Sequence, residues 1–407
     1  MKRAFTILGS VLLTPVLIAQ TGSKSVTVPI TLDHNRIVID VFLPMPDGTS
    51  KRVRAWVDSG NPDLVMSRRV AALEGAVSCE GPVCKATPPR DIVIGGMKIP
   101  LGLSTALAPA QDPADVMIAG MSPEMNLPTQ VLRNYDIVLD YANRELTVGE
   151  PGSVPFPGKA SKAEISTTGQ IEVVSQIAGQ TYNLALDTGA SISGLSSELI
   201  SRWHKVHASW PFLTGAVGAA NRYGTPDEVE VQVLRVPSLR FGNVDLASVA
   251  FATLGPQAFP LLAKQAEGET MIGRLGGNAF RNYRVGIDYA HGTVYLDRLT
   301  AVAPPDMDVV GLTLRPERDG RYLVVAVVNY AGKPSVAGVG PGDVLVGVDG
   351  APATGATMGQ VWSLLGGRAG QTRALTLERG GQRFTVAATV RRFLASQSPP
   401  DRSTLGK

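Results

Sequence analysis

The chain has 407 residues, a length typical of two or three domains. It contains 44 glycines and 29 prolines, and only 18% of its residues are charged. This composition excludes a coiled coil and a charge-rich disordered chain, and it favours many short strands joined by tight turns. The formal charge is +3, with acidic and basic residues interleaved, so no nucleic-acid partner is expected.

The N-terminus has the features of a secretory signal peptide. Lys2 and Arg3 precede a mostly apolar run from Ala4 to Ala19. This run is shorter than the ~20 apolar residues that a membrane helix needs, so the pattern predicts a signal peptide over residues 1–19. An uncleaved anchor is the alternative. We expect a periplasmic or secreted protein with no membrane span after signal cleavage.

Two segments predict a strand, a turn and a second strand that ends at an aspartate. The strands cover 36–43 and 53–57 before Asp58, and 171–177 and 182–186 before Asp187. An aspartate at the end of an apolar strand is expected to be buried, which is costly without a partner. Neither copy shows an obvious basic partner within its own lobe. Two such units packed face to face would supply each aspartate with the other.

Cys79 and Cys84 enclose a short Glu-Gly-Pro-Val turn. Two cysteines at this spacing in an exported chain predict a local disulfide that acts as a staple. None of the four histidines is near them in the sequence, so the pair does not indicate a metal site.

The chain contains an internal duplication, because three landmarks recur in one order. Arg-Asn-Tyr followed by Asp-Tyr-Ala occurs at 133–142 and 281–290, Asp-Ser/Thr-Gly at 58–60 and 187–189, and a Met-Ile pair before glycine at 117–120 and 271–273. The aspartates of the triplets are 129 residues apart and the Arg-Asn-Tyr landmarks 148 apart, so the second copy is longer inside. We expect two homologous lobes, over residues 25–150 and 153–302.

The triplets Asp58-Ser59-Gly60 and Asp187-Thr188-Gly189 resemble the two active-site loops of aspartic proteases. The similarity covers roughly residues 25–300, and it is greatest to bacterial pepsin/retropepsin-like proteases with two lobes in one chain. The resemblance implies two double-ψ β-barrel lobes, a catalytic pair of Asp58 and Asp187, and an extended polypeptide substrate between the lobes. It also implies that Ser59 and Thr188 hydrogen-bond across the lobe junction.

The chemistry of such a pair explains why both aspartates are needed. Two carboxylates close together cannot both ionise cheaply, so they share one proton. One carboxylate then acts as a base towards water, while the other donates a proton to the scissile carbonyl. Gly60 and Gly189 have no Cβ, which permits a close approach of the facing loop.

The first lobe departs from the family pattern. Asn61 and Pro62 follow Gly60 where small residues are usual, and residues 61–116 contain no tyrosine for a pepsin-type flap. The glycine-rich stretch 215–224 of the second lobe could supply a flap instead, with Gly218 and Tyr223 as candidate contacts. An ordinary surface loop is the alternative.

Other candidate sites are weaker. His204 and His207 are three residues apart at a predicted helix over 197–205, but no third zinc ligand is indicated. The glycines of 273–277 lack the strand-loop-helix unit of a dinucleotide site, and no Gly-x-Ser-x-Gly motif indicates a serine hydrolase. No metal or cofactor is expected.

The C-terminal third begins after a proline-containing linker at 303–307. Residues 337–345, Ala-Gly-Val-Gly-Pro-Gly-Asp-Val-Leu, resemble a bacterial PDZ domain, and the resemblance covers 308–393. It implies that Gly311, Leu312, Thr313 and Leu314 form a loop that holds a peptide's C-terminal carboxylate. The peptide would add a strand beside 312–316, against a helix over 357–365. A purely structural cap is the alternative, and residues 394–407 are predicted to be a disordered tail.

The sequence thus predicts a mainly β, bilobal aspartic endopeptidase followed by a PDZ-like domain, exported and expected to be a monomer. The alternative is a catalytically inactive periplasmic peptide-binding or adaptor protein that retains the protease fold. A lobe-swapped dimer is a third possibility that the duplication within one chain makes unnecessary.

Overall fold

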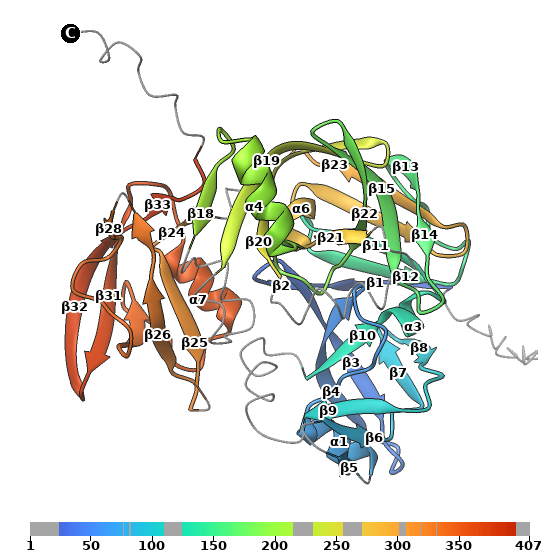
Figure 1. The fold of residues 1–407 in the computed structure, drawn as a ribbon. Coiled ribbons are helices and arrows are strands. Elements are labelled where there is room, and N and C mark those ends of the chain that lie inside the picture. The colour runs from blue at the N-terminus through green and yellow to red at the C-terminus, as the bar shows by residue number, and fades with distance from the viewer. Residues whose placement is uncertain are drawn as a thin grey trace, which may run out of the picture.

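The computed structural model describes residues 24–75, 77–80, 83–109, 124–214, 231–254, 271–300, 307–317, 319–330 and 332–395. The predicted signal peptide, the flap candidates Gly218 and Tyr223, linker residues 303–306 and tail residues 396–407 lie outside these ranges. The prediction of a mainly β chain is confirmed (Figure 1). Among the helices of the described ranges, none has both the length and the hydropathy to cross a membrane.

One six-stranded sheet joins the two lobes. Its order is β1 (Ser25–Pro29), β12 (Glu145–Gly149), β11 (Asp136–Asp140), β22 (Tyr283–Asp288), β23 (Thr293–Arg298) and β13 (Lys159–Lys162). The two central strands pair antiparallel, with Val138 opposite Gly286. β11 directly follows the first Arg-Asn-Tyr motif, and β22 begins at the tyrosine of the second. The duplicated segments therefore meet in the middle of this sheet.

The first lobe adds a sheet whose strand β4 leads directly into the first triplet. Its order is β10 (Met125–Pro128), β4 (Ser50–Asp58), β3 (Arg36–Pro44), β7 (Asp91–Ile94) and β8 (Met97–Pro100), and β2 (Thr31–Asp33) pairs with β3. A second, three-stranded sheet contains β5 (Val77–Glu80), β6 (Val83–Ala86) and β9 (Ala106–Pro109). The described helices of this lobe are α1 (Arg68–Glu74) and α3 (Thr129–Leu132).

The second lobe contains an eight-stranded sheet. Its order is β14 (Glu164–Ile165), β15 (Ile171–Ile177), β16 (Gln180–Leu186), β21 (Met271–Leu275), β17 (Ser193–Leu195), β20 (Val244–Thr253), β19 (Gln232–Phe241) and β18 (Phe212–Thr214). An additional pairing of β15 with β19 curls the sheet back on itself. The described helices are α4 (Ser197–Val206) and α6 (Gly277–Phe280).

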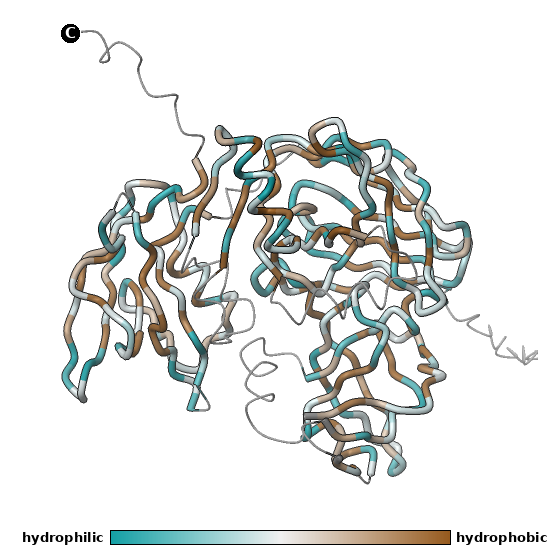
Figure 2. Tube along the Cα trace, viewed as in Figure 1, coloured by the Kyte–Doolittle hydropathy of each residue, from teal (hydrophilic) through white to brown (hydrophobic). Residues whose placement is uncertain are grey.

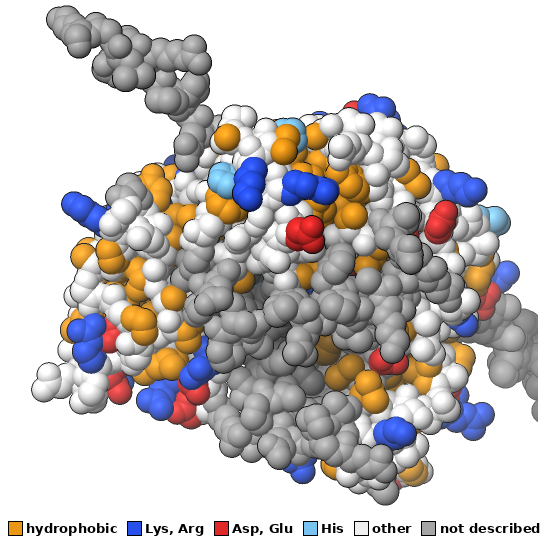
Figure 3. Space-filling model, in the orientation of Figure 1, with side chains coloured by type: hydrophobic (Ala, Val, Ile, Leu, Met, Phe, Trp, Pro, Cys, Tyr) orange, Lys and Arg blue, Asp and Glu red, His pale blue; other side chains and the backbone are white. Residues whose placement is uncertain are grey.

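A single apolar core runs through both lobes, from Val28 to Leu296. Figure 2 shows the hydrophobic residues gathered along the strands that face this interior. On the face drawn in Figure 3, basic and acidic side chains are interspersed.

The C-terminal unit has its own core, from Val310 to Val390. Its main sheet has the order β25 (Leu312–Pro316), β26 (Tyr322–Val327), β29 (Val344–Val348), β31 (Thr372–Arg379) and β32 (Gln382–Thr389), with β30 (Ala351–Pro352) beside β29. The remaining elements are α7 (Met358–Leu365) and the pairs β24 (Asp308–Val309) with β33 (Arg391–Arg392) and β27 (Asn329–Tyr330) with β28 (Lys333–Pro334).

This C-terminal unit packs against both lobes. Met307, Val309 and Phe393 share an apolar cluster with Val233 and Ala252 of the second lobe, and Figure 1 shows β24 close to β18. At the first lobe, Oδ1 of Asp33 accepts hydrogen bonds from the Thr357 hydroxyl and the Gly359 N–H, each at 2.7 Å. The ring of His34 lies 4.3 Å from that of Trp362.

Candidate active site

Asp58 and Asp187 face each other at the junction of the lobes. Asp58 ends β4, Asp187 directly follows β16, and the two residues are 7% and 2% exposed. A Cβ built on Gly60 would lie 2.3 Å from the Cγ of Asp187, and one on Gly189 would lie 2.3 Å from Oδ1 of Asp58. Each glycine thus packs directly on the carboxylate of the opposite lobe.

Ser59 and Thr188 hold the two loops together by reciprocal hydrogen bonds. The Ser59 hydroxyl donates to the Leu186 carbonyl (2.9 Å) and accepts from the Thr188 N–H (3.0 Å). The Thr188 hydroxyl donates to the Val57 carbonyl (2.7 Å) and accepts from the Ser59 N–H (3.1 Å). All four bonds cross the lobe junction, so the loops are fixed relative to each other.

Asp58 lies among neutral donors. Its Oδ2 accepts from the Trp56 indole N–H at 2.9 Å and lies 3.5 Å from the Asn126 side-chain nitrogen, and its Oδ1 accepts from the Gly60 N–H at 3.2 Å. Burial, followed by the negative charge of Asp187, raises the pKa of Asp58 from 3.8 to about 7. The hydrogen bonds from Trp56 and Gly60 act in the opposite direction. Asp58 can therefore hold a proton near neutral pH.

Asp187 has a cationic partner. Its Oδ1 accepts from the Gly189 and Ala190 N–H groups, each at 3.0 Å, and its Oδ2 accepts from Nη1 of Arg274 at 2.7 Å. The expectation that neither aspartate has a basic partner within its own lobe is therefore wrong for Asp187. Arg274 was missed because it lies 87 residues further along the chain, on the strand that pairs in parallel with β16.

The structure also corrects one landmark of the repeat. The sequence comparison matched residues 117–120, which lie outside the described ranges, with 271–273; the described strand that pairs in parallel with β4 is Met125–Pro128. Leu127 lies opposite Val57, as Leu275 lies opposite Leu186. Met125-Asn126-Leu127 is therefore equivalent to Gly273-Arg274-Leu275. The offset between the two Arg-Asn-Tyr motifs gives this same alignment, but the similarity of the two Met-Ile pairs suggested a different one.

Two buried tyrosines from the repeated Asp-Tyr-Ala motifs lie near the pair. Tyr141 is 3% and Tyr289 7% exposed, and within the described residues neither hydroxyl has a hydrogen-bond partner. Burial, together with the charge of Asp187, raises the pKa of Tyr141. Burial and the charge of Asp58 do the same for the pKa of Tyr289. The pKa of each tyrosine is therefore raised in part by the charge of the aspartate of the other lobe. In the sequence, these tyrosines served only as landmarks of the repeat.

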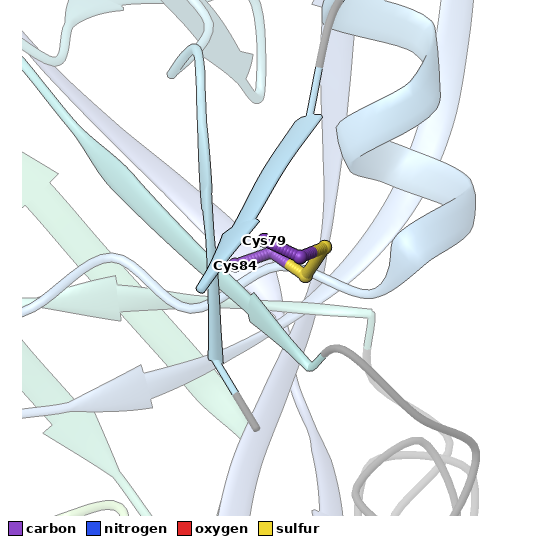
Figure 4. The surroundings of a disulfide bond; sticks show 2 residues. All are labelled: Cys79 and Cys84. Atoms are coloured by element: carbon purple, nitrogen blue, oxygen red, sulfur yellow. A yellow bond between two sulfur atoms is a disulfide. The ribbon is translucent and has the colours of Figure 1, made fainter. Parts of the chain in front are cut away.

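Cys79 and Cys84 form a disulfide (Figure 4). They lie directly opposite each other on β5 and β6, with their Cα atoms 4.0 Å apart. The bond therefore joins neighbouring strands of a hairpin and acts as a local staple.

The four residues expected to form a carboxylate-binding loop lie together at the start of β25. Gly311 has a φ of +55°, and its carbonyl accepts from the Val328 N–H at 2.9 Å. Leu312, Thr313 and Leu314 are each at most 2% exposed. The loop is thus buried in this structure, and peptide binding there stays a prediction.

His204 of α4 and His207, which caps the C-terminus of this helix, stack on aromatic rings. His204 lies 3.7 Å from the ring of Phe212, and His207 lies 4.2 Å from that of Trp210. Within the described ranges, histidine, cysteine and carboxylate side chains form no group of three suited to a metal ion.

No protein-family model and no curated protein sequence matches the chain. Among solved structures, it is similar to an aspartic proteinase from Irpex lacteus. The two share 13% sequence identity with a TM-score of 0.40, and the match covers 68% of this chain and 98% of the other.

Proposed function

We propose that the protein is an aspartic endopeptidase whose catalytic residues are Asp58 and Asp187. The observation that carries this proposal is the direct contact of each triplet glycine with the opposite carboxylate, fixed by the reciprocal bonds of Ser59 and Thr188. Two buried carboxylates this close favour sharing one proton. Such a pair can act as acid and base on one bound water and one carbonyl.

The proposal extends to export and to the C-terminal unit. The N-terminal pattern supports a periplasmic or secreted location, and the PDZ-like motif supports recognition of C-terminal peptides or partners. The packing of α7 against Asp33 and His34 places this unit beside the first lobe. A peptide bound to the C-terminal unit would therefore lie close to the two lobes.

The test is peptide cleavage by the mature chain from about pH 4 to pH 8, because a carboxylate pair works over an acidic to neutral range. Asp58→Asn and Asp187→Asn should each abolish cleavage of a broad peptide library. Asp245→Asn is the matched control, since it changes an exposed aspartate of the second lobe. Full activity in either variant of the pair would exclude this mechanism.

The second candidate is a binding protein that retains the protease fold. The ion pair between Arg274 and Asp187 favours it, because the pair engages Oδ2 of one of the two carboxylates. A wild-type chain that binds library peptides but cleaves none would support this candidate. Deletion of residues 303–407 tests the C-terminal unit, which should alter the choice of protein substrates while cleavage of short peptides continues.

A further inference from the structure

Asn126 and Arg274 occupy equivalent positions in the two lobes but differ in charge. Each lies on the strand that runs parallel to the one leading into its triplet. The side-chain nitrogen of Asn126 is 3.5 Å from Oδ2 of Asp58, whereas Nη1 of Arg274 is 2.7 Å from Oδ2 of Asp187. One carboxylate of the pair thus faces a neutral amide and the other a cation.

Burial strengthens the electrostatic effect of this difference in charge between Asn126 and Arg274. The side chains of Arg274 and Asp187 are 11% and 3% exposed, so water screens their attraction weakly. Among the described residues, the titratable groups facing the site are Asp58 at the end of β4, Asp187 after β16, and Tyr141 and Tyr289 after β11 and β22. All four of these groups are acids, whereas Arg274 is a cation and lies next to Asp187.

We propose that Arg274 is a positioning residue that fixes the single proton of the pair on Asp58 and the negative charge on Asp187. This inference rests on the proposed function. The Asp187 carboxylate takes a proton from water as the water oxygen bonds to the scissile carbon, and Asp58 gives its proton to the carbonyl oxygen. Asp187 then passes its proton to the leaving nitrogen as the C–N bond breaks, and Asp58 recovers a proton from a hydroxyl of the tetrahedral intermediate.

The location of the proton can be determined by NMR, in a measurement that does not require the protein to cleave peptides. Aspartates labelled with ¹³C at Cγ would be observed by NMR at about pH 5.5, which lies between the ordinary 3.8 and the raised pKa of Asp58. Asp58→Asn and Asp187→Asn assign the two signals. We expect a protonated Asp58 and an ionised Asp187. Two signals that titrate together in the wild type would overturn the inference, even if no variant of Arg274 folds.

Variants of Arg274 then test the cause. In Arg274→Asn, which copies the first lobe, the two signals should move towards each other as the proton becomes shared. Arg274→Lys keeps the charge and should keep the signals apart. Arg240→Gln is the control, because it breaks an exposed ion pair with Asp245 in the same lobe. Unchanged signals in Arg274→Asn would contradict the proposal.

The pH dependence of kcat/KM gives an independent measurement. The charge of Arg274 lowers the pKa of Asp58, so the alkaline limb should move up by about one pH unit in Arg274→Asn and stay in place in Arg274→Lys. A merely structural arginine would lower the rate without moving the limb. A wild type with separated signals that cleaves no peptide would contradict the proposed function and support this inference; a cleaving enzyme with a shared proton would do the reverse.

Discussion

Gly60 packs so closely on Asp187 that a Cβ at this position would lie 2.3 Å from Cγ of the carboxylate. The contact joins residues of different lobes, and it leaves no space for any side chain. The same relationship holds between Gly189 and Asp58. The separation of the two carboxylates therefore depends on the absence of two Cβ atoms.

Gly60→Ala should force the loops apart. Overpacking of this kind costs about 1–3 kcal/mol of stability, and displacement of the pair by about 1 Å can reduce kcat by ~100-fold. Peptide cleavage and urea unfolding would measure both effects. Gly340→Ala is the control, because nothing lies within 4 Å of a Cβ there and its φ is not positive. A wild-type kcat in Gly60→Ala would show that the loops can accommodate a Cβ at position 60 without displacing the carboxylate pair.

Ser59→Ala and Thr188→Ala should each weaken the lobe junction. Either change removes the hydroxyl that bonds one carbonyl and one N–H of the opposite loop, at a cost of about 1–3 kcal/mol for each group left unpaired. Thr188→Ser keeps the hydroxyl and should recover most of the loss. Denaturant titration of both single variants and the double variant measures the coupling, which should be non-additive because the two residues share one network. Strictly additive costs would argue against a shared network.

The free energy of unfolding should depend on pH through Asp58. Because the native pKa is about 7 and the ordinary value is 3.8, the native state retains a proton that the unfolded state releases between these values. This contribution to stability is complete below about pH 4 and is lost as the pH rises through about 7, at up to about 1.4 kcal/mol per pH unit. Urea titrations over this range should show a smaller decline in Asp58→Asn. Equal declines in both proteins would contradict the raised pKa.

Asp33→Ala should loosen the C-terminal unit from the first lobe. The variant removes the acceptor of the Thr357 hydroxyl and the Gly359 N–H, a loss of about 1–3 kcal/mol for bonds to a charged group. Hydrogen exchange of the Gly359 amide should accelerate. Asp47→Ala is the control, because Asp47 bonds only locally to Thr49 among the contacts seen. Unchanged exchange at Gly359 would mean that other contacts hold the unit in place.

Local patterns predicted the strands and the loops well. The hairpin before Asp187 was expected over 171–177 and 182–186 and is observed over Ile171–Ile177 and Gln180–Leu186. The helix expected over 357–365 is observed as Met358–Leu365, capped by Thr357. Such elements follow from period-two alternation and capping residues, which are properties of neighbouring positions.

Contacts between distant segments were harder to predict. Arg274 reaches Asp187 only because β21 lies parallel to β16, and Asp33 reaches Gly359 across 326 residues. No periodicity marks such pairs, because they depend on strand order and on how separate units pack. The duplication could have indicated the place of Arg274, had the register of the Arg-Asn-Tyr motifs been extended back to Asn126.

The pairing of β11 with β22 has a consequence for symmetry. Val138 lies opposite Gly286. The number of residues between them along the chain equals that between Arg133 and Arg281, so Val138 and Gly286 are equivalent positions of the repeat. A pseudo-two-fold axis therefore passes through this pair, as in an isologous contact between identical subunits. Two identical lobes would have to present the same residue to both carboxylates. Fusion into one chain removes that restriction, and it lets one half keep an amide at position 126 while the other carries a guanidinium at position 274.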